Sequence, residues 1–106
     1  MAKFLIKATY TAEGAKGLMR DGGSGRRAAI TKALDSMGGK LEGLYFAYGD
    51  VDVYVLIDVP DAASAIAMSL TVNASGAVHA SMTPLITPEE LDAATKKTVS
   101  YRAPGA

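Results

Sequence analysis

The stretch from Tyr48 to Pro60, YGDVDVYVLIDVP, constrains the fold of this chain more than any other. Valine or isoleucine occupies every second position from Val51 to Val59, and this period is typical of a β-strand that buries one face. Residues 41–48 have a similar character, and residues 49–50 between the two segments predict a tight hairpin loop. We therefore expect antiparallel strands over residues 41–48 and 51–59.

The register of this hairpin sorts its side chains into two faces. A two-residue loop pairs Phe46 with Val53, and a four-residue loop preserves the same sorting. The valine row then packs beneath helices. The reverse face carries a mixed set of aromatic, acidic and aliphatic residues, namely Tyr45, Asp52, Tyr54 and Leu56. Because this face is half apolar, we expect it to be an interaction surface rather than open to solvent.

Further strands and helices flank the hairpin. Residues 3–10 and 78–83 alternate as strands, and Thr11 is placed to cap a short helical turn that the Gly-rich residues 20–25 interrupt. Two longer helices have apolar residues at helical spacing, which we expect to face the sheet: Ile30, Ala33, Leu34 and Met37 in residues 25–37, and Ala63, Ile66, Ala67 and Leu70 in residues 61–75. The capping-box sequence TPEEL, residues 87–91, predicts a short final helix.

The order β, α, β, β, α, β predicts an α+β, ferredoxin-like βαββαβ sandwich. In that fold two helices cover one face of a four-stranded antiparallel sheet, and the other face has no cover from the same chain. We expect one domain over residues 1–97 and a loose C-terminal tail over residues 98–106.

Composition limits the classes of function. The 106 residues include 11 basic and 11 acidic side chains, so the chain lacks the positive field that holds nucleic acids. Its apolar runs fall far short of the roughly 20 residues that cross a bilayer, and residues 1–10 lack a signal-peptide core. We therefore expect a cytoplasmic protein. With no cysteine and with His79 as the only histidine, the sequence indicates no metal site, no catalytic triad and no cofactor.

Several segments resemble the GYD domain family, which is named for a glycine, a tyrosine and an aspartate near the hairpin turn. They are LEGLYFAYGDVDVYVLIDVPD over the hairpin, YTAEGAKGL near the start, GGKLEGLYF before the turn, VPDAASA at the second long helix and TPEELDAA near the end. The resemblance spans residues 3–95. Gly49 and Asp52 match the family pattern, whereas Val51 stands where that pattern has tyrosine.

This resemblance implies a fold and an assembly but no defined activity. The family is similar in fold to the dimeric α/β-barrel group, in which ferredoxin-like subunits associate through their sheets. A homo-oligomer formed through the uncovered sheet face is therefore expected. Facing sheets pack about 10 Å apart, so the association would bury the half-apolar surface.

The same face carries the candidate site residues. We expect it to present eight side chains: Lys7, Thr9, Tyr45, Asp52, Tyr54, Leu56, His79 and Ser81. If the two sheets splay, the pocket between them suits a small organic ligand, with Asp52 or His79 as proton acceptor and Tyr45 or Tyr54 as donor. Two of these residues also have simpler explanations. Asp52 beside a turn commonly binds backbone amides, and His79 is an ordinary surface or interface residue.

The segment RDGGSGRR, residues 20–27, is a second candidate site. Its glycines allow backbone amides to converge on an anion at a helix N-terminus, where Ser24, Arg26 and Arg27 add polar and positive groups. The segment lacks the GxxxxGK[ST] spacing of a phosphate-binding loop and follows a helical turn rather than a strand. The alternative is a flexible connection between helical pieces.

Together these patterns predict a small oligomeric module, of unassigned activity, that binds a ligand or a partner. A cofactor-independent enzyme acting on a small organic substrate between the sheet faces is the alternative. A purely structural assembly is a third interpretation, which a fully filled space between the sheets would favour.

Overall fold

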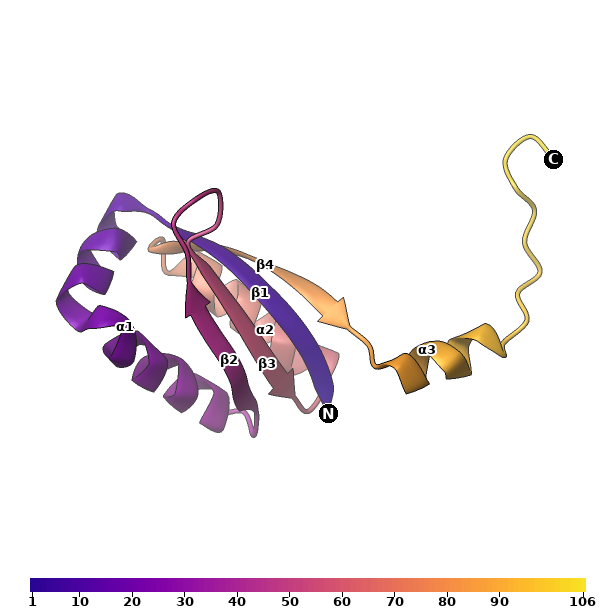
Figure 1. Cartoon of the computed structure of the whole chain (residues 1–106), viewed down its shortest axis with the longest axis horizontal. Helices are drawn as coiled ribbons and strands as arrows, with labels where there is room; N and C mark the ends of the chain where they lie inside the picture. The colour runs from indigo at the N-terminus through magenta and orange to yellow at the C-terminus, as the bar shows by residue number, and fades with distance from the viewer.

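The computed structural model describes all 106 residues. The strands are β1 (Ala2–Tyr10), β2 (Lys40–Phe46), β3 (Val53–Val59) and β4 (Val78–Leu85), and the helices are α1 (Ala12–Asp35), α2 (Ala62–Ala74) and α3 (Pro88–Thr95). The strands form one antiparallel sheet in the order β2-β3-β1-β4. α1 and α2 cover one side of it, and α3 lies beyond its edge (Figure 1). The predicted ferredoxin-like α+β fold is thus confirmed.

The centre of the core is the helix-facing side of β3. Its aliphatic residues are buried, whereas Tyr54 and Leu56 between them are exposed. The core comprises Ile6, Ala8, Leu34, Val53, Val55, Ile57, Val59, Ala65 and Met68. Because burying one aliphatic side chain contributes about 1.5–3 kcal/mol, the alternation along β3 fixes which face the helices cover.

The β2–β3 hairpin has the predicted register and a longer loop. Phe46 lies opposite Val53, as expected. The last bond between the two segments joins the Ala47 amide to the Asp52 carbonyl at 2.7 Å, so residues 48–51 form the turn. The predicted two-residue loop is therefore wrong, and the hairpin has the four-residue loop that was the alternative.

α1 is interrupted within the Gly-rich segment, as predicted, by a kink between two helical pieces. Inside the helix only Gly22 has non-helical backbone angles, with φ 72° and ψ 172°, a conformation that glycine adopts without steric cost. Thr11 caps the helix as predicted, accepting a hydrogen bond from the Gly14 amide at 3.2 Å. Leu34 is fully buried. The expected interruption is therefore a kink at one residue.

α2 faces the sheet with a different side from the one predicted. Ala65 and Met68 are buried, whereas Ile66 and Leu70 are 59% and 67% exposed. The expectation that Ile66 and Leu70 face the core is therefore wrong. α2 is apolar almost all the way round, so its periodicity does not distinguish a core side. Ala65, whose side chain is small, allows close approach to the strands.

α3 begins with the predicted capping box. The Thr87 hydroxyl accepts from the Glu90 amide, and the Glu90 carboxylate accepts from the Thr87 amide, both at 3.1 Å. α3 and the residues that follow it project away from the sheet and its two covering helices (Figure 1). Residues 98–106 contain no helix or strand.

Candidate functional site

The uncovered face of the sheet is built from alternate residues of all four strands. Cross-strand pairing aligns Tyr45, Tyr54, Lys7 and Ser81 in one row from β2 to β4. The next row on β1 and β4 pairs Thr9 with His79. Because Ile6 and Ala8 of β1 are buried on the helix side, alternation puts their neighbours on the uncovered side. The structure therefore places every predicted residue except Asp52 on this face.

One half of the face is apolar and exposed. Tyr45 is 71% exposed, and Tyr54 and Leu56 are 38% exposed each. Half-buried Leu5 lies opposite Leu56 in the ladder. Neighbouring apolar side chains that share a surface of this kind mark interaction sites more often than single exposed residues do. We refer to Leu5, Tyr45, Tyr54 and Leu56 as the apolar patch.

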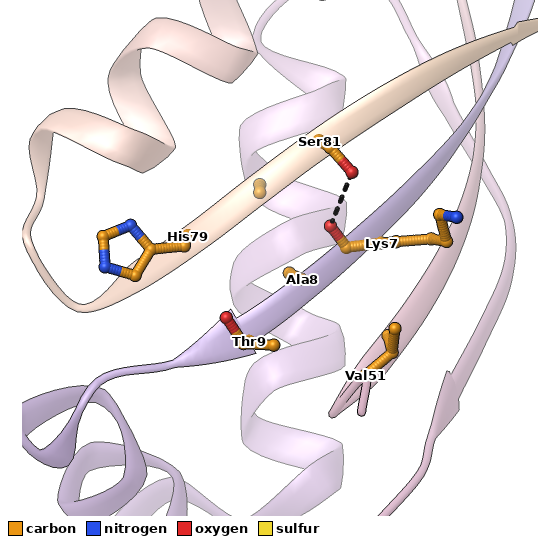
Figure 2. A pocket seen from close by; sticks show the side chains of 7 residues that line it. Lys7, Ala8, Thr9, Val51, His79 and Ser81 are labelled. Carbon is orange, nitrogen blue, oxygen red and sulfur yellow. Dashed lines mark hydrogen bonds between the residues drawn. The ribbon is translucent and has the colours of Figure 1, made fainter. Parts of the chain in front are cut away.

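The other half of the face carries a hollow of about 390 Å³ above β1 and β4. It is lined by Lys7, Ala8, Thr9, Val51, His79, Ala80 and Ser81. Figure 2 shows the Lys7 side chain extending toward β3, whereas the His79 ring points toward the outer edge of β4. The Ser81 hydroxyl donates to the Lys7 carbonyl at 3.5 Å. The hollow thus combines a cation, two hydroxyls and an imidazole with one aliphatic side chain.

The acidic groups of this face are gathered around Lys3. Its ammonium binds Glu42 and lies 3.1 Å from Asp58. These hydrogen bonds, first that to Glu42 and then that to Asp58, raise the pKa of Lys3 above its ordinary value of 10.5. Glu42 reaches this position at a β-bulge, since the β2–β3 register shifts between Leu41 and Gly43. Lys7, by contrast, forms no ion pair in the chain.

Asp52 lies on the helix side of the sheet, contrary to expectation. Its carboxylate accepts a hydrogen bond from the Tyr10 amide at 2.8 Å. It lines a separate hollow of about 350 Å³ with Tyr10, Ala15, Leu18, Gly23, Phe46 and Ala47. The Asp52 amide donates to the Ala8 carbonyl at 3.0 Å, although Ala8 is the ladder partner of Val53. This shift interrupts the alternation at the end of β3.

The same shift brings Val51 to the uncovered face. Val51 lines the hollow beside Lys7, although the hairpin pattern had assigned it to the helix side. Sequence reasoning therefore missed this residue as part of the site. Its position in the Gly-x-Tyr-Asp pattern was the available signal, because it is where this chain departs from that pattern.

The proton-transfer candidates do not form one cluster. Tyr45 and Tyr54 are direct cross-strand neighbours, and His79 borders the hollow on the far side of β1. Asp52 faces the helices and is bound to a backbone amide. The simpler explanation of Asp52, a carboxylate that binds the backbone near a turn, matches this contact. Its donor, Tyr10, is distant in sequence.

The arginine candidates lie near another hollow, of about 530 Å³, beside α1 and α2. Arg26 lines it together with Arg20, and the acidic residues Glu13 and Asp21 line it as well. The Nε atom of Arg26 is buried without a hydrogen-bond partner. Ser24 and Arg27 are exposed and lie outside this hollow. The three predicted anion-binding residues are thus not gathered around one cavity.

No three histidine, aspartate or glutamate residues lie close enough together to hold a metal ion. None of the helices has both the length and the hydropathy to cross a membrane.

Comparison with known proteins connects the chain to one family. The GYD domain model matches residues 4–95 of the 106-residue chain. Neither the curated proteins nor the solved structures include a match. The matched region contains the sheet except for the first two residues of β1, together with both covering helices and α3. The chain therefore belongs to the GYD domain family.

Proposed function

We propose that this protein is a small homo-oligomeric module whose subunits associate through their uncovered sheet faces and hold a small organic ligand between them. The observation that carries the proposal is the joint presence, on one face, of the apolar patch and the polar hollow above β1 and β4. A cytoplasmic location is part of the proposal.

Association through this face follows from the exposure of the apolar patch. Removing apolar surface from water contributes about 25 cal/mol per Å², and a second copy offers the same patch. Two identical patches brought together by a twofold axis are self-complementary, which is the commonest arrangement in homodimers. The pairing would give the sheet the second cover that its own two helices do not supply.

A ligand site follows from the hollow beside the patch. Its volume of about 390 Å³ lies within the range of small-molecule pockets. The hollow is open in the single chain, and a second sheet packed about 10 Å above it would close it off from solvent. This arrangement puts the hydroxyls of Thr9 and Ser81 within an enclosed space, where they can orient a bound molecule.

Sedimentation of the wild type and two matched variants tests the association. Leu56→Glu adds a carboxylate to the proposed interface, and Ile66→Glu adds one to the exposed side of α2. Burying an unpaired charge costs several kcal/mol, so Leu56→Glu should weaken self-association at least about 100-fold. Ile66→Glu should leave it unchanged. Circular dichroism checks that both variants fold.

A wild type that sediments as a single subunit at about 1 mM would refute the proposal, since even a weak specific complex forms at that concentration. Equal weakening by both substitutions would assign the association to another surface.

A further inference from the structure

The charge of Lys7 has no partner within the chain. Lys7 stands midway along β1, which has β3 on one side and β4 on the other. Its ladder neighbours on the uncovered face are Tyr54 and Ser81, neither of which carries a negative charge. In the isolated subunit water solvates the ammonium, because the side chain is exposed.

The carboxylates carried by the four strands, and that of Asp52, are already engaged elsewhere. Glu42 and Asp58 both bind Lys3. Lys3 lies on the same face of β1 as Lys7, four residues before it. Asp52 lies on the helix side, bound to the Tyr10 amide. No acidic residue lines the hollow beside Lys7. The face therefore provides one uncompensated positive charge at the edge of an empty space.

Sheet-to-sheet association would change the energy of this charge. An ammonium that loses water without gaining a counter-charge is penalised by several kcal/mol. A negative group that enters the hollow removes most of this penalty, and it gains a charge-assisted hydrogen bond in a medium of low dielectric constant. A negatively charged ligand in the hollow would therefore supply the counter-charge that Lys7 needs in the associated form.

The lining of the hollow indicates which kind of anion fits. Thr9 and Ser81 supply hydroxyls, while Val51 supplies an aliphatic wall. The Lys7 ammonium is a compact single charge, unlike the planar guanidinium of arginine, which binds two oxygens at once. Its one positive charge balances the one negative charge of a carboxylate. A volume of about 390 Å³ accommodates carbon atoms as well as the anionic group.

We infer that the hollow binds a small organic carboxylate, one in each subunit, with the Lys7 ammonium as its counter-charge. The inference rests on the proposed association through the sheet faces. It makes self-association and anion binding two linked equilibria, because the carboxylate binds the associated form more tightly than the single subunit.

The test measures the self-association constant by sedimentation at constant ionic strength. The probes are acetate and benzoate, with benzamide as the uncharged match for benzoate and inorganic phosphate as the alternative anion. A carboxylate at ten times its dissociation constant should strengthen association about tenfold for each occupied site. Benzamide should have no effect, and phosphate should have less effect than the carboxylates.

Variants of Lys7 separate its charge from its bulk. Lys7→Met should associate more tightly than the wild type in chloride alone, because the buried charge is gone, and should lose the response to acetate and benzoate. Lys7→Arg should retain the response. Lys32→Met, on the exposed side of α1, removes one positive charge away from the face and should behave as the wild type.

Three results would overturn the inference while leaving the proposed association intact: an oligomer that responds to neither carboxylate, a response to phosphate alone, or weaker association of Lys7→Met in chloride. The third would show that a carboxylate of the second subunit supplies the counter-charge. A single-subunit wild type under every condition would instead refute the proposed association itself.

Discussion

At the scale of single residues, Gly14 shows how closely the start of α1 approaches Ala77, the residue before β4. A Cβ atom at this position would overlap the Ala77 carbonyl oxygen, which accepts a hydrogen bond from the Thr11 amide at 3.0 Å. Gly14→Ala should therefore lower the free energy of unfolding by about 1–3 kcal/mol or more. Gly17→Ala, in the same helix, meets only the end of the Arg20 side chain at 3.9 Å. It should raise stability by about 0.5–1 kcal/mol.

Urea unfolding of the two alanine variants beside the wild type measures both changes. The decisive result is that the two substitutions change the unfolding free energy in opposite directions, because helix propensity alone predicts that both would raise it. A gain in stability for Gly14→Ala would mean that the start of α1 lies farther from Ala77 than this close contact implies.

Lys3 gives a pH dependence whose direction follows from its raised pKa. Glu42 and Asp58 stabilise the ammonium in the folded state, so their contribution to stability is complete below pH 10.5 and is lost as the pH rises through the folded-state pKa. The difference in unfolding free energy between wild type and Lys3→Met should therefore stay constant from neutral pH to about pH 10 and shrink above it. A difference that grows with alkaline pH would contradict this assignment.

The positions of Asp52 and Val51 mark the limit of residue-level prediction. Alternation assigned the faces correctly wherever the ladder is regular, as at Lys7, Tyr45, Tyr54 and His79. It failed where the Asp52 amide bonds to the Ala8 carbonyl, because that contact joins two segments 44 positions apart (52 − 8). A bond of this kind leaves no local pattern in the sequence.

At the scale of elements, α2 has two apolar sides of unequal importance. Met68 is 8% exposed, whereas Ile66 is 59% exposed. Met68→Ala removes packing atoms from the core and should cost about 2–5 kcal/mol of unfolding free energy. Ile66→Ala, on the exposed side, should change stability by no more than about 0.5 kcal/mol. Chemical denaturation of both variants decides between the observed and the sequence-predicted orientation of the helix, since the predicted orientation reverses the order.

The hairpin and α2 explain why the elements were predictable to different degrees. In the hairpin, one buried face allows only one register, because a one-residue slip would expose every valine. α2 has alanine, isoleucine, methionine, leucine or valine on nearly every side, so no rotation is excluded by polar residues. Its orientation depends on the fit of Ala65 and Met68 against the strands, which is a property of the packed structure.

At the scale of the whole molecule, the order of strands and helices was sufficient to predict the ferredoxin-like sheet, because few topologies accommodate βαββαβ. The position of α3 was not predictable. Its capping box specifies where the helix begins, but a local signal does not specify where the helix lies. The chain exposes 7331 Å², compared with about 5,600 Å² for a compact monomer of this mass.

This large exposed surface and small core make the stability of the proposed assembly depend on concentration. Only 11 of 106 residues are buried in the single chain, so association through the sheet should contribute a substantial part of the stability. If two subunits unfold together, each tenfold rise in protein concentration adds about 1.4 kcal/mol to the stability of the dimer. At an unfolding entropy of about 2.1 cal/mol/K per residue over both chains, this corresponds to a rise of about 3 °C in melting temperature.

The variant Leu56→Glu should melt at a lower temperature that does not depend on concentration, whereas Ile66→Glu should follow the wild type. Calorimetry over a hundredfold range of concentration measures the slope. A flat slope for the wild type would mean that the core of one chain carries the stability alone.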